Sequence, residues 1–172
     1  MEKEPRFEMY PRLTVLLCTL VTLSIYGLGT WILSGLGWWV AGLYLFFCFW
    51  LEWRVLKKSC VNCVYFGKRC GLGKGKWSAA LFKQGEGPRA FALKTASWVD
   101  VLPDLLVSLV PLFTGTVLSF VAFSWLRLLA MSLLVLVGFG GNAAVRGVLL
   151  CKYCKQAEIG CPAQKLFERI PR

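Results

Sequence analysis

Four long apolar segments constrain this chain more than any other feature of its sequence. Residues 13–34 carry no charged side chain, and a membrane-spanning helix needs about 20 apolar residues at about 1.5 Å of rise each. Three further apolar segments follow at residues 38–56, 99–124 and 128–150. The sequence therefore predicts an all-α integral membrane protein with four transmembrane helices.

The composition agrees with a lipid environment. Hydrophobic residues make up 57% of the chain and charged residues 17%, whereas a soluble domain averages about 25% charged residues. The residues before the first apolar segment are polar and of mixed charge, and no small-residue cleavage site follows that segment. We therefore expect the first segment to stay in the mature protein as a membrane anchor and not to be a signal peptide.

The net charge of +11 would indicate a nucleic-acid partner in a soluble protein. Lys and Arg beside membrane spans instead usually face anionic lipid, so we expect no nucleic-acid partner here. Residues 71–98 mix basic side chains with large apolar ones such as Trp77 and Phe91. This mixture suits a basic amphipathic loop that lies on the bilayer, with its charges on anionic headgroups and its apolar side chains dipped in.

Six of the eight cysteines lie in two copies of the pattern C-x2-C-x6-C. The copies occupy residues 60–70 and 151–161, and each directly follows an apolar segment. The cysteines concerned are Cys60, Cys63, Cys70, Cys151, Cys154 and Cys161. Cys18 and Cys48 lie inside apolar segments, where a lone cysteine usually acts as a small hydrophobic residue.

The matched cysteine clusters indicate an internal repeat. We expect a first repeat at residues 1–70, the basic loop at 71–98 and a second repeat at 99–172, with Pro11 and Pro103 opening corresponding spans. Each repeat reads as helix, tight turn, helix and cysteine cluster. Two spans return the chain to its starting side, so the repeats should be parallel and related by a pseudo-two-fold axis along the membrane normal.

The distribution of Lys and Arg predicts the orientation in the membrane. Ten of them lie between residues 54 and 94, whereas the turns expected at 34–37 and 125–127 hold none and one. The positive-inside rule then places both termini, the loop and both cysteine clusters on the cytoplasmic side of the cell (inner) membrane. Because the cytoplasm keeps thiols reduced, the cluster cysteines are predicted to be free thiols or metal ligands.

Zinc is the cofactor that this cysteine spacing favours. A C-x2-C pair places two thiolates within reach of one metal ion, but a closed tetrahedral site needs four ligands and each cluster has three. The clusters are therefore predicted to meet, since six thiolates can hold two zinc ions if two sulfurs bridge. The spacing resembles that of the fungal binuclear zinc-cluster domains. The resemblance covers the six cysteines alone, and it implies a ligand geometry and not a DNA-binding role.

Two other uses of the cysteines stay open. Four of them, two from each repeat, could hold a [4Fe–4S] iron–sulfur cluster, and Pro162 directly after Cys161 is similar to ferredoxin motifs. C-x-x-C is also an oxidoreductase motif. In that respect the pair Cys60 and Cys63 resembles the quinone-linked disulfide-forming membrane proteins, which also have four helices but carry their reactive cysteines on the oxidising side.

Polar residues in the third and fourth apolar segments form a second candidate site, made of Asp104, Asn142 and Arg146. Asn142 and Arg146 are four residues apart and share a helix face. Charged groups in membrane spans are rare and usually face the bundle interior. The three residues form either a polar cavity for a substrate, lipid headgroup or proton, or a structural ion pair in which Arg146 reaches the interface. We favour the ion pair.

The sequence does not indicate an enzyme. Without histidine, no Ser or Cys nucleophile has an evident base partner, and closed Cys-only metal sites are usually structural. We expect a scaffold or subunit of a larger membrane complex or homo-oligomer, with its repeats clamped by metal. The alternatives are an electron-transfer or thiol-oxidoreductase subunit, and a small transporter or lipid-binding protein.

Overall fold

The computed structural model describes residues 6–94 and 97–162, and this part of the chain contains helices and no strands. Three long helices are α1 (Arg12–Ser34), α2 (Trp38–Lys58) and α5 (Trp98–Val121). A fourth begins as α6 (Trp125–Val135) and continues through η2 (Leu136–Gly141), α7 (Asn142–Ala144) and η3 (Val145–Leu150). The short elements are η1 (Cys60–Asn62), α3 (Lys74–Leu81), α4 (Pro88–Leu93), η4 (Cys151–Tyr153) and α8 (Gln156–Ile159).

Four helical stretches are long and apolar enough to cross a membrane: Arg12–Ser34, Trp38–Asn62, Trp98–Val121 and Trp125–Tyr153. The expected all-α fold with four candidate spans is therefore confirmed. Large apolar side chains cover the outside of these helices, as the exposure of Trp39 (89%) and Phe120 (87%) illustrates. Residues 163–172, the end of the second expected repeat, and residues 95–96 of the loop lie outside the described residues.

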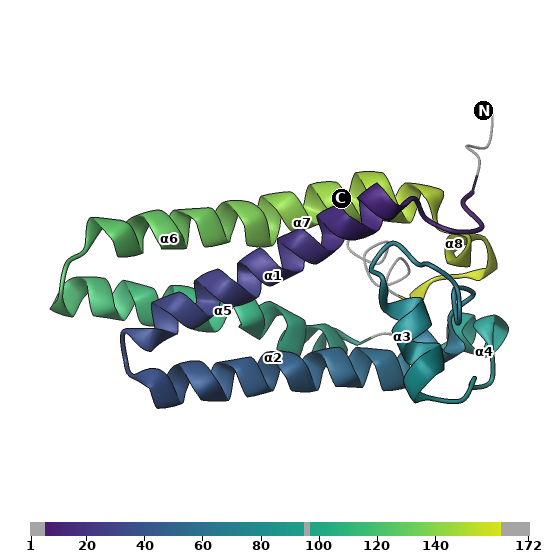
Figure 1. The fold of residues 1–172 in the computed structure, drawn as a ribbon, viewed down its shortest axis with the longest axis horizontal. Coiled ribbons are helices and arrows are strands. Elements are labelled where there is room, and N and C mark those ends of the chain that lie inside the picture. Colours follow the sequence, from purple (N-terminus) through teal and green to yellow (C-terminus); the bar gives the residue numbers. More distant parts are fainter. Residues whose placement is uncertain (1–5, 95–96, 163–172) are drawn as a thin grey trace.

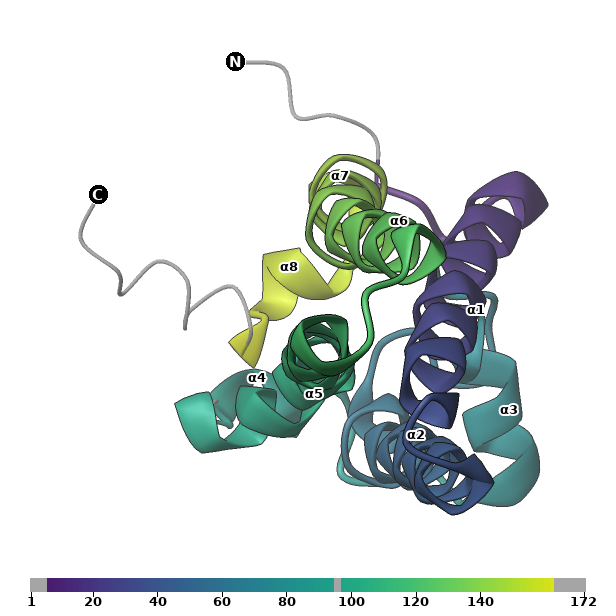
Figure 2. The ribbon, with the colours of Figure 1, turned by 90° about the vertical axis from the view of Figure 1, so that its left-hand side faces the viewer.

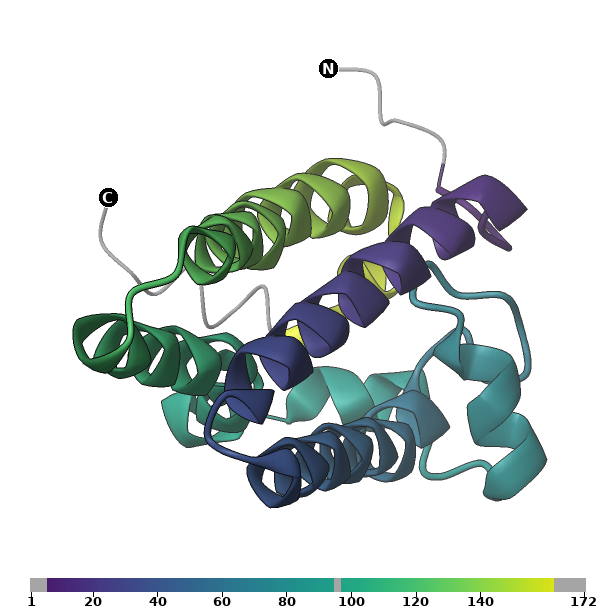
Figure 3. The ribbon, with the colours of Figure 1, turned by 60° about the vertical axis from the view of Figure 1, so that its left-hand side comes forward.

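Helix α1 is the central helix of the bundle. It packs against α2, α5, α6, η2 and η3. In Figure 1 it crosses the bundle obliquely and ends beside the start of α2. Figures 2 and 3 show α2 on one side of α1 and α6 on the other. Both cysteine clusters lie with α3, α4 and α8 at one end of the bundle (Figure 1), which we call the cysteine end.

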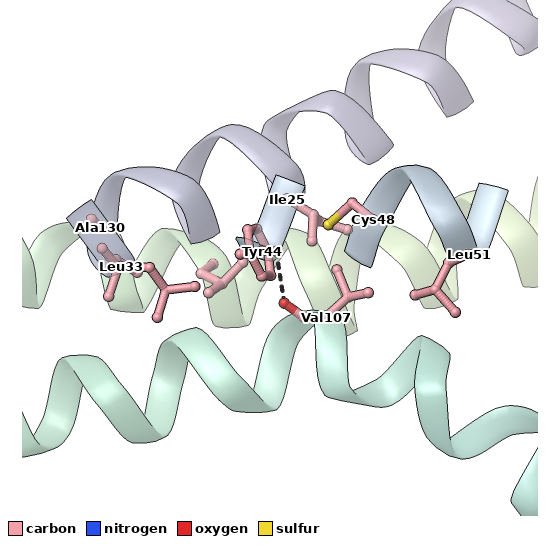
Figure 4. Packing of buried hydrophobic residues seen from close by; sticks show 9 residues of the cluster. Ile25, Leu33, Tyr44, Cys48, Leu51, Val107 and Ala130 are labelled. Carbon is pink, nitrogen blue, oxygen red and sulfur yellow. Dashed lines mark hydrogen bonds between the residues drawn. The ribbon is translucent and has the colours of Figure 1, made fainter. Parts of the chain in front are cut away.

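The interior away from the cysteine end is an apolar core contributed by all four long helices (Figure 4). Its buried members are Ile25, Ile32, Leu33, Tyr44, Cys48, Leu51, Val107, Ala130 and Leu134. Cys48 is only 2% exposed among these side chains, in keeping with a small hydrophobic residue.

The turn between α1 and α2 lies where the sequence placed it, between Ser34 and Trp38. Gly37 closes this turn with a φ of 130°, a conformation that glycine adopts without a steric penalty.

The other tight turn lies at residues 122–124 and not at the expected 125–127. Its position follows from Arg127, which sits in the first turn of α6 and reaches back to the end of α5. The Arg127 guanidinium donates to the carbonyls of Leu118 (2.8 Å) and Ala122 (2.7 Å). The Leu118 carbonyl also accepts the Ala122 amide at 2.9 Å, and the Ala122 carbonyl follows the end of α5. A cationic donor from the next helix therefore caps this end of α5.

Pro103 does not open its span, contrary to expectation, although Pro11 directly precedes α1. Helix α5 starts earlier, at Trp98, because Ser97 and Asp100 form a capping box that satisfies its first amides. Pro103 therefore lies inside the helix.

A second proline inside α5, Pro111, lacks the amide hydrogen that would bond to the Val107 carbonyl four residues earlier. The Tyr44 hydroxyl on α2 donates to this freed carbonyl at 2.9 Å (Figure 4). Because an unpaired carbonyl inside a bilayer is costly, this bond ties α2 to α5 at the break in the helical ladder.

Candidate functional site

The two C-x2-C pairs form the same turn. Each follows a long helix and begins with a short 3₁₀ segment, η1 or η4. The amide of Cys63 donates to the carbonyl of Cys60, and the amide of Cys154 donates to that of Cys151, both at 3.3 Å. Cys63 and Cys154 then have extended backbones, with φ of −81° and −80°.

Backbone amides point at the sulfurs of three cysteines. The pKa of Cys63 and of Cys154 is raised by burial, and nearby backbone amides oppose this rise: Tyr65 for Cys63, and Gln156 and Ala157 for Cys154. The Cys70 sulfur accepts the amide of Gly75 at 3.3 Å. Such hydrogen bonds favour a thiolate over a thiol.

The two turns bind each other through a reciprocal pair of hydrogen bonds. The amide of Val64, next to Cys63, donates to the Gln156 side-chain oxygen at 3.0 Å. The amide of Lys155, next to Cys154, donates to the Tyr65 hydroxyl at 3.0 Å. In each turn, the backbone amide of the residue that follows the second cysteine donates to the other turn. The side chain of the next residue accepts the matching amide from the other turn.

Gln156 and Tyr65 are almost fully buried, at 2% and 3% exposed. The Gln156 amide nitrogen also donates to the carbonyls of Pro88 (3.2 Å) and Gly160 (2.9 Å). The Tyr65 hydroxyl donates to the Phe7 carbonyl at 2.8 Å. Sequence reasoning missed both residues, although each lies two positions after a C-x2-C pair.

The N-terminal residues cross both turns. The Phe7 amide donates to the Tyr153 carbonyl at 3.2 Å, and the Tyr10 amide donates to the Arg69 carbonyl at 3.0 Å. The buried Tyr10 hydroxyl donates to the Leu150 carbonyl at 2.7 Å. The lead-in before the first span is thus part of the site, which the sequence did not predict.

The structure gathers the predicted cysteines into a single region. Cys63, Cys70 and Cys154 pack against one buried cluster, whose core is Tyr10, Cys18, Tyr65 and Leu150. Cys161 is close enough to interact electrostatically with Cys63, Cys151 and Cys154. Cys60 interacts in the same way with Cys63 and Cys70.

Burial sets the protonation of these thiols in the absence of a metal. It raises the pKa of Cys63 to about 11 and also raises the pKa of Cys154. Both side chains are therefore neutral thiols at pH 7. All eight cysteines are free.

The thiols do not converge on one metal position as they stand. Across residues 6–94 and 97–162, no three Cys, Asp or Glu side chains are arranged so that they could hold a metal ion. The donor chemistry suits zinc, but the ligand geometry expected for two bridged zinc ions is not formed here. The metal assignment of the six cysteines stays a prediction.

The second candidate site lies on the last two spans. Asp104 on α5 and Arg146 on η3 attract each other electrostatically, and both side chains are exposed on the bundle. Asn142 is partly buried at the start of α7, one turn before Arg146. The ion pair that we favoured stays a prediction.

Sequence reasoning missed a further ionic contact next to the cysteines. The Lys74 ammonium lies 2.6 Å from a Glu52 carboxylate oxygen, and the Tyr26 hydroxyl donates to the other oxygen at 2.7 Å. Glu52, an acidic residue near the end of the second apolar segment, was the sequence signal that could have indicated this contact.

No protein-family model, no curated protein and no solved structure matches this chain.

Proposed function

We propose that this protein is a small membrane scaffold or complex subunit whose two halves are joined at the cytoplasmic face by a cysteine site, with zinc as the favoured occupant. The observation that carries the proposal is the reciprocal pair of hydrogen bonds between the turns, Val64 to Gln156 and Lys155 to Tyr65. A two-fold rotation that exchanges the turns also exchanges these two bonds, as in a symmetric dimer interface. This supports the repeat that the sequence pattern suggests.

The chemistry around the sulfurs supports a metal. Backbone amides of Tyr65 and Gln156 favour the thiolates of Cys63 and Cys154, and comparable outer-shell bonds tune metal sites. Burial opposes the charge of an unbound thiolate, as the raised pKa of Cys63 shows. A zinc ion would relieve this opposition by replacing the thiol protons. The bound form would need the thiols to reorient toward the ion.

A second candidate function is thiol redox chemistry. It is favoured by the proximity of Cys63 and Cys154, which act on each other electrostatically. Two thiols would lose two protons and two electrons to a membrane quinone, forming one disulfide and the quinol.

Metal analysis of the anaerobically purified full-length protein tests the zinc proposal. We expect about two zinc ions per chain, with loss of zinc in Cys63→Ser and in Cys154→Ser. Cys48→Ala is the control, because Cys48 belongs to the separate apolar core and should leave the zinc content unchanged. Iron with absorption near 400 nm would instead favour an electron-transfer subunit. A metal-free protein with an oxidisable Cys63–Cys154 pair would favour the thiol oxidoreductase.

The cytoplasmic placement has a separate test. A membrane-impermeant thiol reagent applied to intact cells should leave the cluster cysteines unmodified, and the same reagent should modify them after the cells are opened. Labelling from outside would reverse the orientation inferred from the Lys and Arg distribution.

The loop between the repeats is proposed to rest on anionic lipid. Trp77 (68% exposed), Leu81 (51%) and Leu93 (82%) present apolar side chains outside the spans, and Lys76 is exposed beside Trp77. Apolar anchors next to cations suit the headgroup region. Thermal unfolding in nanodiscs should show greater stability with anionic than with zwitterionic lipid, and less difference after Lys76→Gln.

A further inference from the structure

A charged network connects the second span to the cysteine site. The Glu52 carboxylate uses both oxygens: Lys74 pairs with one and Tyr26 donates to the other. The Glu52 and Lys74 side chains are only 26% and 18% exposed. The contacts join three elements, since Tyr26 lies on α1, Glu52 on α2 and Lys74 on α3.

Stability alone does not account for such a network. A carboxylate within a membrane span is costly, and ionisable residues there are generally functional. A buried ion pair often contributes no more than apolar residues of similar size. The partners of Lys74 indicate what the network does.

Lys74 is the first residue of α3, and the start of α3 closes the first cysteine turn. The amide of the next residue, Gly75, donates to the Cys70 sulfur at 3.3 Å, and the Gly75 carbonyl accepts the amide of Gly67 at 3.0 Å. A Cβ atom at Gly75 would overlap the carbonyl oxygens of Tyr65 and Lys68, so α3 starts in close contact with this turn.

The Lys74 ammonium also acts electrostatically on Cys60. One lysine therefore acts on one cluster cysteine and directly precedes the residue whose amide bonds to another. The carboxylate that fixes this lysine belongs to the transmembrane bundle.

We propose that Glu52 is a positioning residue for the cysteine site. Through Lys74 it holds the start of α3, and with it the amide that bonds to the Cys70 sulfur, while Tyr26 fixes the Glu52 carboxylate to α1. What the site binds rests on the proposed function. The positioning of Cys60 and Cys70 does not depend on the bound species.

Residue-resolved alkylation of the full-length protein in detergent tests the positioning directly. In Glu52→Gln and in Lys74→Met, we expect the alkylation rates of Cys60 and Cys70, measured by mass spectrometry, to rise about tenfold, because local opening becomes easier. Tyr26→Phe keeps the ion pair and should give a smaller rise. Lys76→Met is the matched control, since Lys76 is an exposed lysine of the same helix, and it should leave both rates unchanged.

The charge swap Glu52→Lys with Lys74→Glu separates positioning from a general loss of folding. It should restore slow alkylation at least in part, because the ion pair is rebuilt with its partners exchanged. Unchanged rates in both Glu52→Gln and Lys74→Met would overturn the inference. So would a swap that alkylates as fast as the single variants.

Zinc affinity, measured by competition with a chelator, gives the second readout. Because Glu52→Gln loosens the Gly75 amide that bonds to the Cys70 sulfur, it should weaken zinc binding about 10–100-fold. A wild-type protein that binds no zinc, combined with faster alkylation in Glu52→Gln, would refute the zinc proposal and leave the positioning role standing. A wild-type protein that binds zinc, combined with unchanged alkylation in the variants, would refute the positioning role and leave the zinc proposal standing.

Discussion

Tyr65 and Gln156 show how two side chains can join two segments about half the chain apart. Each is buried and accepts the amide that follows the other segment's C-x2-C pair. A buried amide that loses its acceptor retains the full cost of desolvation. Removing either side chain should therefore destabilise the fold mainly by leaving the Val64 or the Lys155 amide without an acceptor.

Gln156→Leu should lower the free energy of unfolding by about 1–3 kcal/mol, because the Val64 amide loses its acceptor inside the protein. Tyr65→Phe should have an effect of the same order through the Lys155 amide. The double variant should cost less than the sum, since either change already loosens the contact between the turns. Thermal or denaturant unfolding in detergent measures all three.

Tyr153→Phe is the control for this cycle, because the Tyr153 ring packs on Phe7 while its hydroxyl contributes neither of the two reciprocal bonds. It should change stability by less than about 0.5 kcal/mol. Strict additivity of the Gln156 and Tyr65 variants would show that the two bonds act independently.

At the scale of helices, the bundle depends on contacts that compensate for breaks in α5 and allow close packing of α1. Tyr44 takes part in both. Its hydroxyl satisfies the carbonyl that Pro111 leaves free, and its ring lies against Gly29 so closely that a Cβ atom there would overlap it. These contacts join α1, α2 and α5.

Tyr44→Phe should destabilise the protein by about 1–2 kcal/mol, since the Val107 carbonyl is left unpaired in the apolar core. Pro111→Ala supplies an amide that can bond to this carbonyl within α5. The double variant should therefore be more stable than Tyr44→Phe alone. Pro111→Ala could instead lower the melting temperature equally in the wild-type and in the Tyr44→Phe background. The unpaired Val107 carbonyl would then not be the cause of the destabilisation by Tyr44→Phe.

Gly29→Ala should lower the free energy of unfolding by about 1–3 kcal/mol, because the added methyl group displaces the Tyr44 ring. Gly27→Ala is the matched control two residues away in α1, where a Cβ atom would meet nothing within 4 Å. Its effect should stay within about 0.5 kcal/mol. Equal effects at the two positions would argue against the close packing of α1 on α2.

At the scale of the whole molecule, the N-terminal lead-in connects the two halves. Glu8 pairs with Lys68 of the first cluster region at 3.6 Å and with Lys155 of the second. The hydrogen bond from Lys155 is the main reason that the pKa of Glu8 lies below 4.5, its usual value. The exposed carboxylate thus contributes to holding the turns together only while it is ionised.

A lowered pKa means that folding favours the ionised form of Glu8, so its contribution is present above pH 4.5 and is lost as the pH falls through the folded-state pKa. Glu8→Gln should make the melting temperature less dependent on pH across this window. High salt should shrink the difference between wild type and variant at pH 7, because exposed ion pairs are screened. The same pH dependence in both proteins would exclude Glu8 as a contributor.

The sequence by itself determined the four spans and the local form of the two cysteine turns. Spans follow from the length and hydropathy of consecutive residues, and each C-x2-C turn is closed by a hydrogen bond between residues three apart. Both are short-range properties. Even so, the boundaries at Pro103 and at the second turn were wrong, because a capping box and the reach of Arg127 decided them.

The tertiary structure alone decided which polar groups meet. Nothing local to Glu52 names Lys74 as its partner, and nothing local to Gln156 names Val64. These pairs form because helix packing brings distant segments together, after which each buried polar group must find a partner from whatever is near. The spacing of the cysteines could suggest a metal, but the convergence of their thiols depends on the same packing, and the described residues do not form a three-ligand group.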